Sequence, residues 1–473
     1  MRFTLIYSLG LFFCTVLTIS GCSLRQAEQN QAALPTELHD NIEQTWWTMY
    51  NEPELNKLVE RALEQNIDLQ QSRLMTEKAF YQLKISQQEL WPKAGATLGG
   101  KKNKNLENGR ENTSFSSDLS LNYELDLWKK LAASTQANQH SYQASQQDLQ
   151  AARISLASTV IDAWFHLASL DQSILLMQKN LDCHKQLFAI SRARYLAGKT
   201  SKSPFRASRQ ALLSAKMRLV ELQKNQRDVI VMLNNILNLK PKEAQNLKPA
   251  PVINAAQHTV NLDIPLSVLG QRPDLRAAES RLQAAWSQKE AQQRNWYPKI
   301  SLRAGIGTQT DEPGKLFDIP IGMGSISVAL PFLQWNTLKW QNKIAEANFQ
   351  SARLDFEKKL TTALNEVASA SHHYRLAQKN LAWNEEKHAL ELENSRYHQL
   401  RHEQGSGEFE DWLRALTVLY TTEQAIAQAK YQVLKYENLI YKSMAGRYST
   451  GKKKADSSAD KTPDCCCDQQ PHP

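Results

Sequence analysis

The chain of 473 residues has few cysteines, and none of them is spaced like a disulfide framework. Its six cysteines are Cys14, Cys22, Cys183 and the consecutive Cys465, Cys466 and Cys467. Small secreted folds that rely on disulfides instead of a core carry an even, regularly spaced set. This class of protein is therefore excluded.

Clusters of catalytic or metal-binding residues are also lacking. The adjacent pair His372-His373 points to two different faces of a helix, which does not suit a zinc site. No Ser-His-Asp arrangement and no glycine-rich phosphate loop occurs. Asp464 to Cys467 with His472 offer donors for a soft metal, but the surrounding Ser, Lys, Asp and Pro favour a disordered tail. We expect no enzyme, no cofactor and no metal centre.

Only one long apolar run is present, and it lies at the amino terminus. Leu5 to Thr18 follows Met1-Arg2 and has the length of a secretory signal, too short for a spanning helix. It ends in Ile19-Ser20-Gly21-Cys22, which resembles a bacterial lipobox and predicts cleavage before Cys22 and acylation of its sulfur. Ser23 resembles the outer-membrane class of such lipoproteins. A plain signal peptide with an incidental cysteine is the alternative.

The formal net charge of +9 is moderate for this length, and the mean hydropathy is −0.53. Part of the charge lies in Lys452-Lys453-Lys454, and we interpret the rest as dispersed. No basic stripe with interleaved aromatic residues is visible, so nucleic acid is not an expected partner.

The chain repeats itself after 206–207 residues. Asn66-Ile67-Asp68-Leu69 corresponds to Arg272-Pro273-Asp274-Leu275, and in both copies a Pro-Lys pair begins 24 residues after the Asp. Tyr123 to Trp128 corresponds to Leu330 to Trp335. The period is too long for a solenoid unit, so the sequence predicts a duplicated half-molecule.

Each half contains a stretch without proline or glycine that predicts a very long helix. Leu131 to Tyr195 carries apolar residues at 4–3 spacing, which is typical of a coiled-coil seam. At about 1.5 Å per residue, such helices reach about 100 Å. Gly198 and the Gly405-Ser406-Gly407 run predict the turns, and Ser203-Pro204 predicts the start of a returning helix.

A strand pair precedes each long helix. We expect strands at Ala94 to Lys101, Phe115 to Asp126, Ile300 to Thr308 and Met323 to Phe332, where apolar and polar residues alternate. Strands near ten residues are typical of a transmembrane barrel, although ordinary surface hairpins show the same pattern. Four strands cannot close a barrel in lipid, so a membrane location requires an oligomer.

With these features, the chain resembles a TolC-type outer membrane factor of the lipoprotein branch found in multidrug and cation efflux. The resemblance covers roughly residues 40–446 and rests on motifs that match in order: Trp46-Trp47, Pro53-Glu54-Leu55, Ala62 to Asn66, the run from Arg272, the strand-to-helix junctions and the two glycine turns. It implies a mainly helical homotrimer. Each chain gives four strands to one 12-stranded outer-membrane barrel that continues into a periplasmic helical barrel. It also implies contact with outer membrane lipid, a periplasmic adaptor and an inner-membrane pump.

The resemblance also assigns candidate residues. Asp411 matches the first acidic position of the periplasmic aperture, and Arg414 stands where the family has a second Asp. These two side chains are expected to pair along the helix or between subunits, with solvated surface charges as the alternative. The tips expected to contact the adaptor are Gly198, Lys199, Gly405, Ser406 and Gly407.

The expected organisation is a signal peptide (1–21), a lipidated segment (22–60), two repeats (61–243 and 244–446) and a disordered tail (447–473). Efflux of small molecules is the favoured function. A duct for polypeptide secretion and a structural envelope lipoprotein are the other candidates, and the paired strands argue against the latter.

Overall fold

The computed structural model describes residues 42–43, 45–104, 106–107, 109–240, 249–256, 258, 260, 269–318 and 320–448. Gln44–Tyr448 form one compact unit, and Met1–Glu43 with Ser449–Pro473 form another. The predicted signal peptide, Cys22 and the cysteines of the tail lie outside the described residues. All further description concerns the compact unit, apart from the two-residue strand β1 (Ile42–Glu43).

Two very long helices dominate the unit. They are α4 (Lys130–Leu196) and α8 (Trp335–Glu403), of 67 and 69 residues, or about 100 Å each. The predicted first helix is confirmed to within one residue at each end. Each long helix turns back into a shorter one, α5 (Lys202–Ile236) or α9 (Phe409–Ser443). The other helices are α2 (Pro53–Gln65), α3 (Ile67–Gln88) and α7 (Pro273–Gln293).

The predicted start of α5 is wrong. The helix begins at Lys202 after Ser201, whose side chain makes no capping hydrogen bond. Pro204 therefore lies within the first turn instead of at its first position. This costs little, because the first N–H groups of a helix have no partner within it.

The long helices pack through the predicted 4–3 seams. Val160 and Leu167 of α4 are buried, as are Ala370, Tyr374 and Leu381 of α8. The four helices lie in the order α5, α4, α9, α8, because α4 packs on both α5 and α9, and α9 packs on α8. Their small and aliphatic side chains form the core between neighbouring helices.

The four expected strands form one antiparallel sheet in the order β2–β3–β4–β5. They are β2 (Lys93–Lys104), β3 (Glu111–Leu125), β4 (Lys299–Thr310) and β5 (Ile321–Ala329). The predicted continuation of the last strand to Phe332 is wrong. Pro331, which has no N–H for a strand ladder, begins the short helix η5 (Pro331–Gln334).

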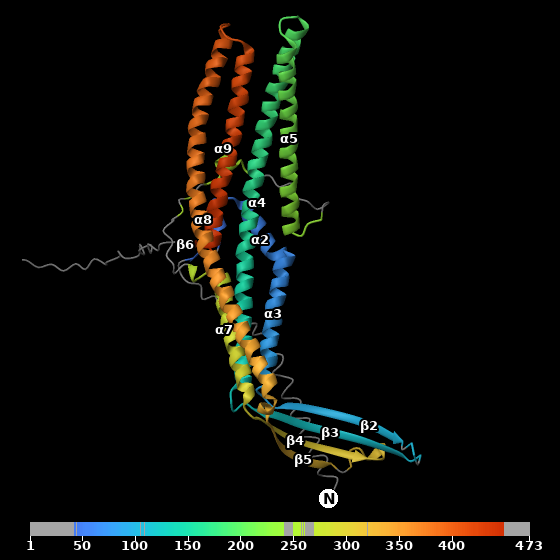
Figure 1. Cartoon of the computed structure of the whole chain (residues 1–473). Coiled ribbons are helices and arrows are strands. Elements are labelled where there is room, and N and C mark those ends of the chain that lie inside the picture. Colours follow the sequence, from blue (N-terminus) through green and yellow to red (C-terminus); the bar gives the residue numbers. More distant parts are fainter. Residues whose placement is uncertain are drawn as a thin grey trace, which may run out of the picture. The chain divides into compact units, whose positions relative to one another are not determined.

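Within the compact unit, the sheet lies at one end of the helices and both hairpin turns lie at the other (Figure 1). Among the described residues, no helix is both long and apolar enough to cross a membrane. The remaining short elements are η1 (Trp46–Tyr50), η2 (Val252–Asn254), η3 (Arg294–Trp296), η4 (Pro313–Lys315) and β6 (Arg447–Tyr448).

Two predicted domain boundaries can be placed on these elements. The boundary at residue 61 falls inside α2, and β6 occupies the first two residues of the expected tail. The boundary at 243 lies outside the described residues.

Candidate functional site

The sheet has one apolar face and one polar face. Leu119 of β3 pairs with Ala96 and Ile306, and directly paired residues point to the same side of a sheet. Six large apolar residues on this face are between 46% and 74% exposed, so no described part of the chain fully covers them: Leu98, Leu119, Leu121, Ile306, Ile326 and Val328. A face of this kind is suited to lipid.

The opposite face carries four charged residues of the central strands: Asp118, Glu124, Lys299 and Arg303. Arg303 of β4 donates to Asp118 of β3 at 2.9 Å. Between them lie Gly305 and Gly307, and a Cβ at Gly307 would stand only 2.9 Å from the carbonyl oxygen of Ser117. Because these glycines leave the strand bare, the Arg303 side chain reaches Asp118 along the sheet. This face is suited to water.

The two hairpin turns at the far end have the same geometry. Gly198 and Gly405 both adopt left-handed conformations, with φ of +72° and +71°. In each turn the next N–H bonds back to a carbonyl oxygen in the last helical turn, from Lys199 to Arg194 and from Ser406 to Arg401. The predicted terminating role of both glycines is confirmed. Gly407 is needed for space, because a Cβ there would lie 2.9 Å from the Cβ of Arg401.

A charged cluster joins the two hairpins beside these turns. Arg194, near the end of α4, donates to Glu408 at 2.8 Å and to Glu410 at 2.9 Å, at the start of α9. Arg414, one helical turn further along α9, donates to the same Glu410 at 2.6 Å. Glu410 is therefore shared by two arginines from helices far apart in the sequence. We call Arg194, Glu408, Glu410 and Arg414 the tip cluster.

The predicted pairing of Asp411 with Arg414 along the helix is not observed. Arg414 bonds to Glu410 instead, at the i,i+4 spacing that brings side chains together on a helix. Asp411 is exposed on another face of α9. Burial lowers the pKa of His184 on α4, and the nearby charge of Arg414 lowers it further.

In the sequence, Glu408 and Glu410 indicate only acids that are favourable at the start of a helix. Their partner Arg194 cannot be predicted, because no local pattern links residues 214 and 216 positions apart. The only available signal was the repeat itself, which places both hairpin turns at equivalent positions.

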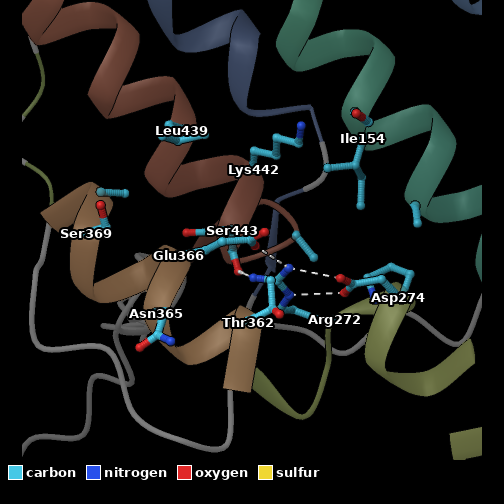
Figure 2. A pocket seen from close by; sticks show the side chains of 15 residues that line it. Ile154, Arg272, Asp274, Thr362, Asn365, Glu366, Ser369, Leu439, Lys442 and Ser443 are labelled. Carbon is cyan, nitrogen blue, oxygen red and sulfur yellow. Dashed lines mark hydrogen bonds and ion pairs between the residues drawn. The ribbon is translucent and has the colours of Figure 1, made fainter. Parts of the chain in front are cut away.

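A cavity of about 620 Å³ lies between α4, α7, α8 and α9, far from the turns (Figure 2). Three of the four charged residues that line it are paired with one another: Arg272 donates to Asp274 at 3.0 and 2.9 Å and to Glu366 at 2.7 Å. It also donates to the carbonyl oxygen of Ser443 at 3.2 Å. Arg272 thus fastens α7 to α8 and α9, which gives this repeated motif a structural role.

None of the described residues forms a cluster of three or more His, Cys, Asp or Glu side chains able to hold a metal ion.

Comparison with known proteins identifies a family and several relatives of this chain. The family model described as "Outer membrane efflux protein" matches residues 58–239 and 264–446. The chain is 31% identical over 413 residues to "Toxin and drug export protein A" of Aggregatibacter actinomycetemcomitans, covering 87% of this chain and 90% of that protein. It is 26% identical over 376 residues to "Cation efflux system protein CusC" of Escherichia coli K12, covering 76% and 81%.

The fold is shared with the CmeC outer membrane channel of Campylobacter jejuni. The TM-score is 0.78 at 21% identity, over 89% of this chain and 92% of that one. The predicted fold, a duplicated and mainly helical chain with four strands in one sheet, is confirmed.

Proposed function

This chain belongs to the outer membrane efflux protein family, and from this premise we propose that it is the passive exit duct of a tripartite efflux system. Its location is the bacterial outer membrane, with the helices extending into the periplasm. Its relatives are channels, not enzymes. The observation that carries the proposal is the sheet with one apolar and one polar face, continuous with helices of about 100 Å.

The sheet supports assembly of three copies. Strands β2 and β5 are its edges, and unpaired backbone groups are not tolerated in the hydrocarbon of a membrane. Three copies bring 12 strands, the number that the family resemblance implies. The apolar face then meets lipid, and the face with Asp118 and Arg303 lines the lumen.

The opposite end supports a narrow periplasmic aperture. In a threefold assembly, three copies of α9 bring Asp411 and Arg414 close to one axis, at the positions that the family resemblance assigns to the aperture. The tip cluster holds the start of α9 against α4, so we expect it to keep the aperture narrow. Exposed pairs of this kind are individually weak and sensitive to salt.

Replacing Arg194 with alanine is therefore expected to widen the aperture. The variant loses both ion pairs that the tip cluster makes between the hairpins, so single-channel conductance in planar bilayers should rise, most clearly at low salt. Arg414→Ala should have a smaller effect in the same direction, because Glu410 remains paired with Arg194. The wild-type channel should itself open as salt screens the pairs.

Arg192→Ala is the matched control, since Arg192 is exposed on the same helix. Equal conductance of Arg194→Ala, Arg414→Ala, Asp411→Ala and wild type at every salt concentration would place the constriction elsewhere.

The turns are the proposed contact with a periplasmic adaptor, which links the duct to an inner-membrane pump. Gly198, Lys199, Gly405 and Ser406 are exposed, and Gly407 is half-buried. They form the end of the unit furthest from the sheet (Figure 1). With the sheet in the outer membrane, this end extends deepest into the periplasm, where it can contact a periplasmic partner.

Acylation of Cys22 is the proposed lipid anchor. Cys22→Ser should leave the chain unacylated, and its signal uncleaved, in intact-mass spectrometry of the membrane fraction. Cys183→Ser, which changes a buried free cysteine, is the control and should mature normally. A wild-type mature chain without acyl groups would refute the anchor.

The duct itself is tested with purified full-length protein. We expect the mass of three copies in detergent, corrected for bound detergent, and ion-conducting pores in planar bilayers. Loss of the chain should also cause a fluorescent efflux dye to accumulate in cells. A monomeric mass, or protein in bilayers without conductance, contradicts the proposal.

Secretion of polypeptides is a second candidate, because the relative at 31% identity is named for export of both toxin and drug. Comparison of secreted proteins with and without this chain decides between the two functions. An unchanged set of secreted proteins with increased dye accumulation supports efflux.

A further inference from the structure

The two hairpins carry opposite charges. Residues 179–228, around the first turn, contain twelve Lys and Arg and three Asp and Glu. The equivalent residues 385–434, around the second turn, contain five Lys and Arg and nine Asp and Glu. The interpretation of the net charge as dispersed is therefore wrong. It is concentrated in the first hairpin and partly offset by the second.

The helices that bear these charges include the two outer ones. Because the order is α5, α4, α9, α8, one side of α5 and one side of α8 have no neighbouring helix among the described residues near the turns. Figure 1 shows α5 and α8 on opposite sides of the unit. Within one chain these two surfaces are separated by α4 and α9.

Each of these surfaces carries an exposed apolar stripe. On α5, Leu213, Met217 and Val220 are 49%, 66% and 64% exposed and continue a 4–3 pattern. On α8, the stripe consists of three residues at intervals of seven and is 66%, 64% and 54% exposed: Trp383, Leu390 and Tyr397. Such spacing is typical of a seam that packs against another helix.

The two stripes lie at the same height. Arg194 bonds directly to Glu408, which keeps the two turns level. Leu213 lies 15 residues after Gly198, and Leu390 lies 15 residues before Gly405. Because all these helices rise by the same amount per residue, the two leucines are level as well.

Charged residues flank the stripes with matching spacing and opposite sign. Arg209 and Lys216 are seven residues apart on α5, and Glu386 and Glu393 are seven residues apart on α8. Counted from the turns, Arg209 is within one residue of the height of Glu393, and Lys216 of Glu386. All four are exposed. None of them forms an ion pair among the described residues.

We propose that α5 of one copy packs antiparallel against α8 of the next copy, with Leu213 opposite Leu390 and with Arg209–Glu393 and Lys216–Glu386 as flanking ion pairs. This contact rests on the proposed assembly of the duct. Around the ring, basic and acidic hairpins then alternate. The alternation sets the height at which neighbouring copies meet and makes the periplasmic part of the tunnel sensitive to salt.

Cysteine cross-linking tests the contact directly. The full-length chain carries Leu213→Cys and Leu390→Cys, with Cys183 and Cys465 to Cys467 changed to serine. Mild oxidation should give covalent dimers and trimers. The control pair, Leu213→Cys with Tyr397→Cys, moves one partner by seven residues, or about 10 Å. That separation is too large for a disulfide, so no cross-link should form.

The outcomes separate this inference from the proposed function. A trimeric mass without cross-links in the Leu213–Leu390 pair overturns the α5–α8 contact and leaves the duct intact. A monomeric mass overturns the duct itself. Equal cross-linking of the control pair also overturns the proposed register.

Charge exchange tests the ion pairs. In the cross-linking background, Lys216→Glu should lower the rate of trimer cross-linking at low salt by roughly two- to fivefold, because it places two acids together. Glu386→Lys should do the same. The double exchange Lys216→Glu with Glu386→Lys should restore the rate. If the double variant is no better than the single ones, the two residues do not face each other.

Discussion

Replacement of Arg272 with alanine is expected to lower the free energy of unfolding by about 1.5–3 kcal/mol. The Arg272 side chain is only 9% exposed and pairs with Asp274 and Glu366. Without it, two carboxylates lose their partner and the carbonyl oxygen of Ser443 loses a donor. The junction of α7, α8 and α9 should weaken accordingly.

The measurement is urea unfolding in detergent at a fixed protein concentration, since assembly makes stability depend on concentration. Lys358→Ala, which removes an exposed side chain on α8, is the control and should change little. Arg272→Lys should recover only part of the loss, because an ammonium group cannot make the two-pronged contact. Equal stability of Arg272→Ala and Lys358→Ala would refute the stabilising role of Arg272.

The stability contributed by the pair of Arg272 and Asp274 should depend on pH. Burial raises the pKa of Asp274, but the hydrogen bonds and charge of Arg272 outweigh it and hold the pKa below its ordinary value of 3.8. A carboxyl with a lowered pKa stabilises the fold above its unfolded pKa and loses this contribution as pH falls through the folded one. The melting-temperature gap between wild type and Asp274→Asn should therefore be constant near neutrality and shrink below about pH 4.

The second large effect concerns the sheet. Leu119→Arg, on the apolar face of β3, is expected to destabilise the membrane-embedded protein by about 2–4 kcal/mol. Ser116→Arg, an exposed position on the opposite face of the same strand, should cost little because that face meets water. Both variants introduce one positive charge, and they differ only in the face of the sheet that carries it.

Unfolding by urea in lipid vesicles gives the free energies, and the yield of trimer in the outer membrane gives an independent comparison. A larger loss of stability for Ser116→Arg than for Leu119→Arg would mean that the lipid-facing and water-facing sides are assigned the wrong way round. Equal and small costs would mean that the sheet does not contact lipid.

Much of the architecture could be predicted because its signals are local. Leu131 to Tyr195 contains no helix breaker and repeats its apolar residues at 4–3 spacing, so α4 matches the prediction to one residue at each end. The turns were found because only glycine readily adopts the left-handed conformation of Gly198 and Gly405. The strands were less sharply bounded, since alternation fades gradually at strand ends.

The tip cluster could not be predicted in the same way. From the sequence, Arg414 has acidic neighbours three and four positions away, Asp411 and Glu410. Both spacings place side chains near each other on a helix. Packing of α4 against α9 brings Arg194 to Glu410. Arg414 also bonds to Glu410, and not to Asp411.

The amino-acid sequence by itself determined the duplication, the long helices, the paired strands and the positions of the turns. These follow from periodicity, from glycine and proline, and from backbone geometry, all of which act within a few residues. Tertiary structure alone decided which charges meet, because Arg194 with Glu410 and Arg272 with Glu366 are joined only when separate helices pack. It also decided that α5 and α8 are the outer helices. The order of packing is a property of the whole chain, and no local pattern contains it.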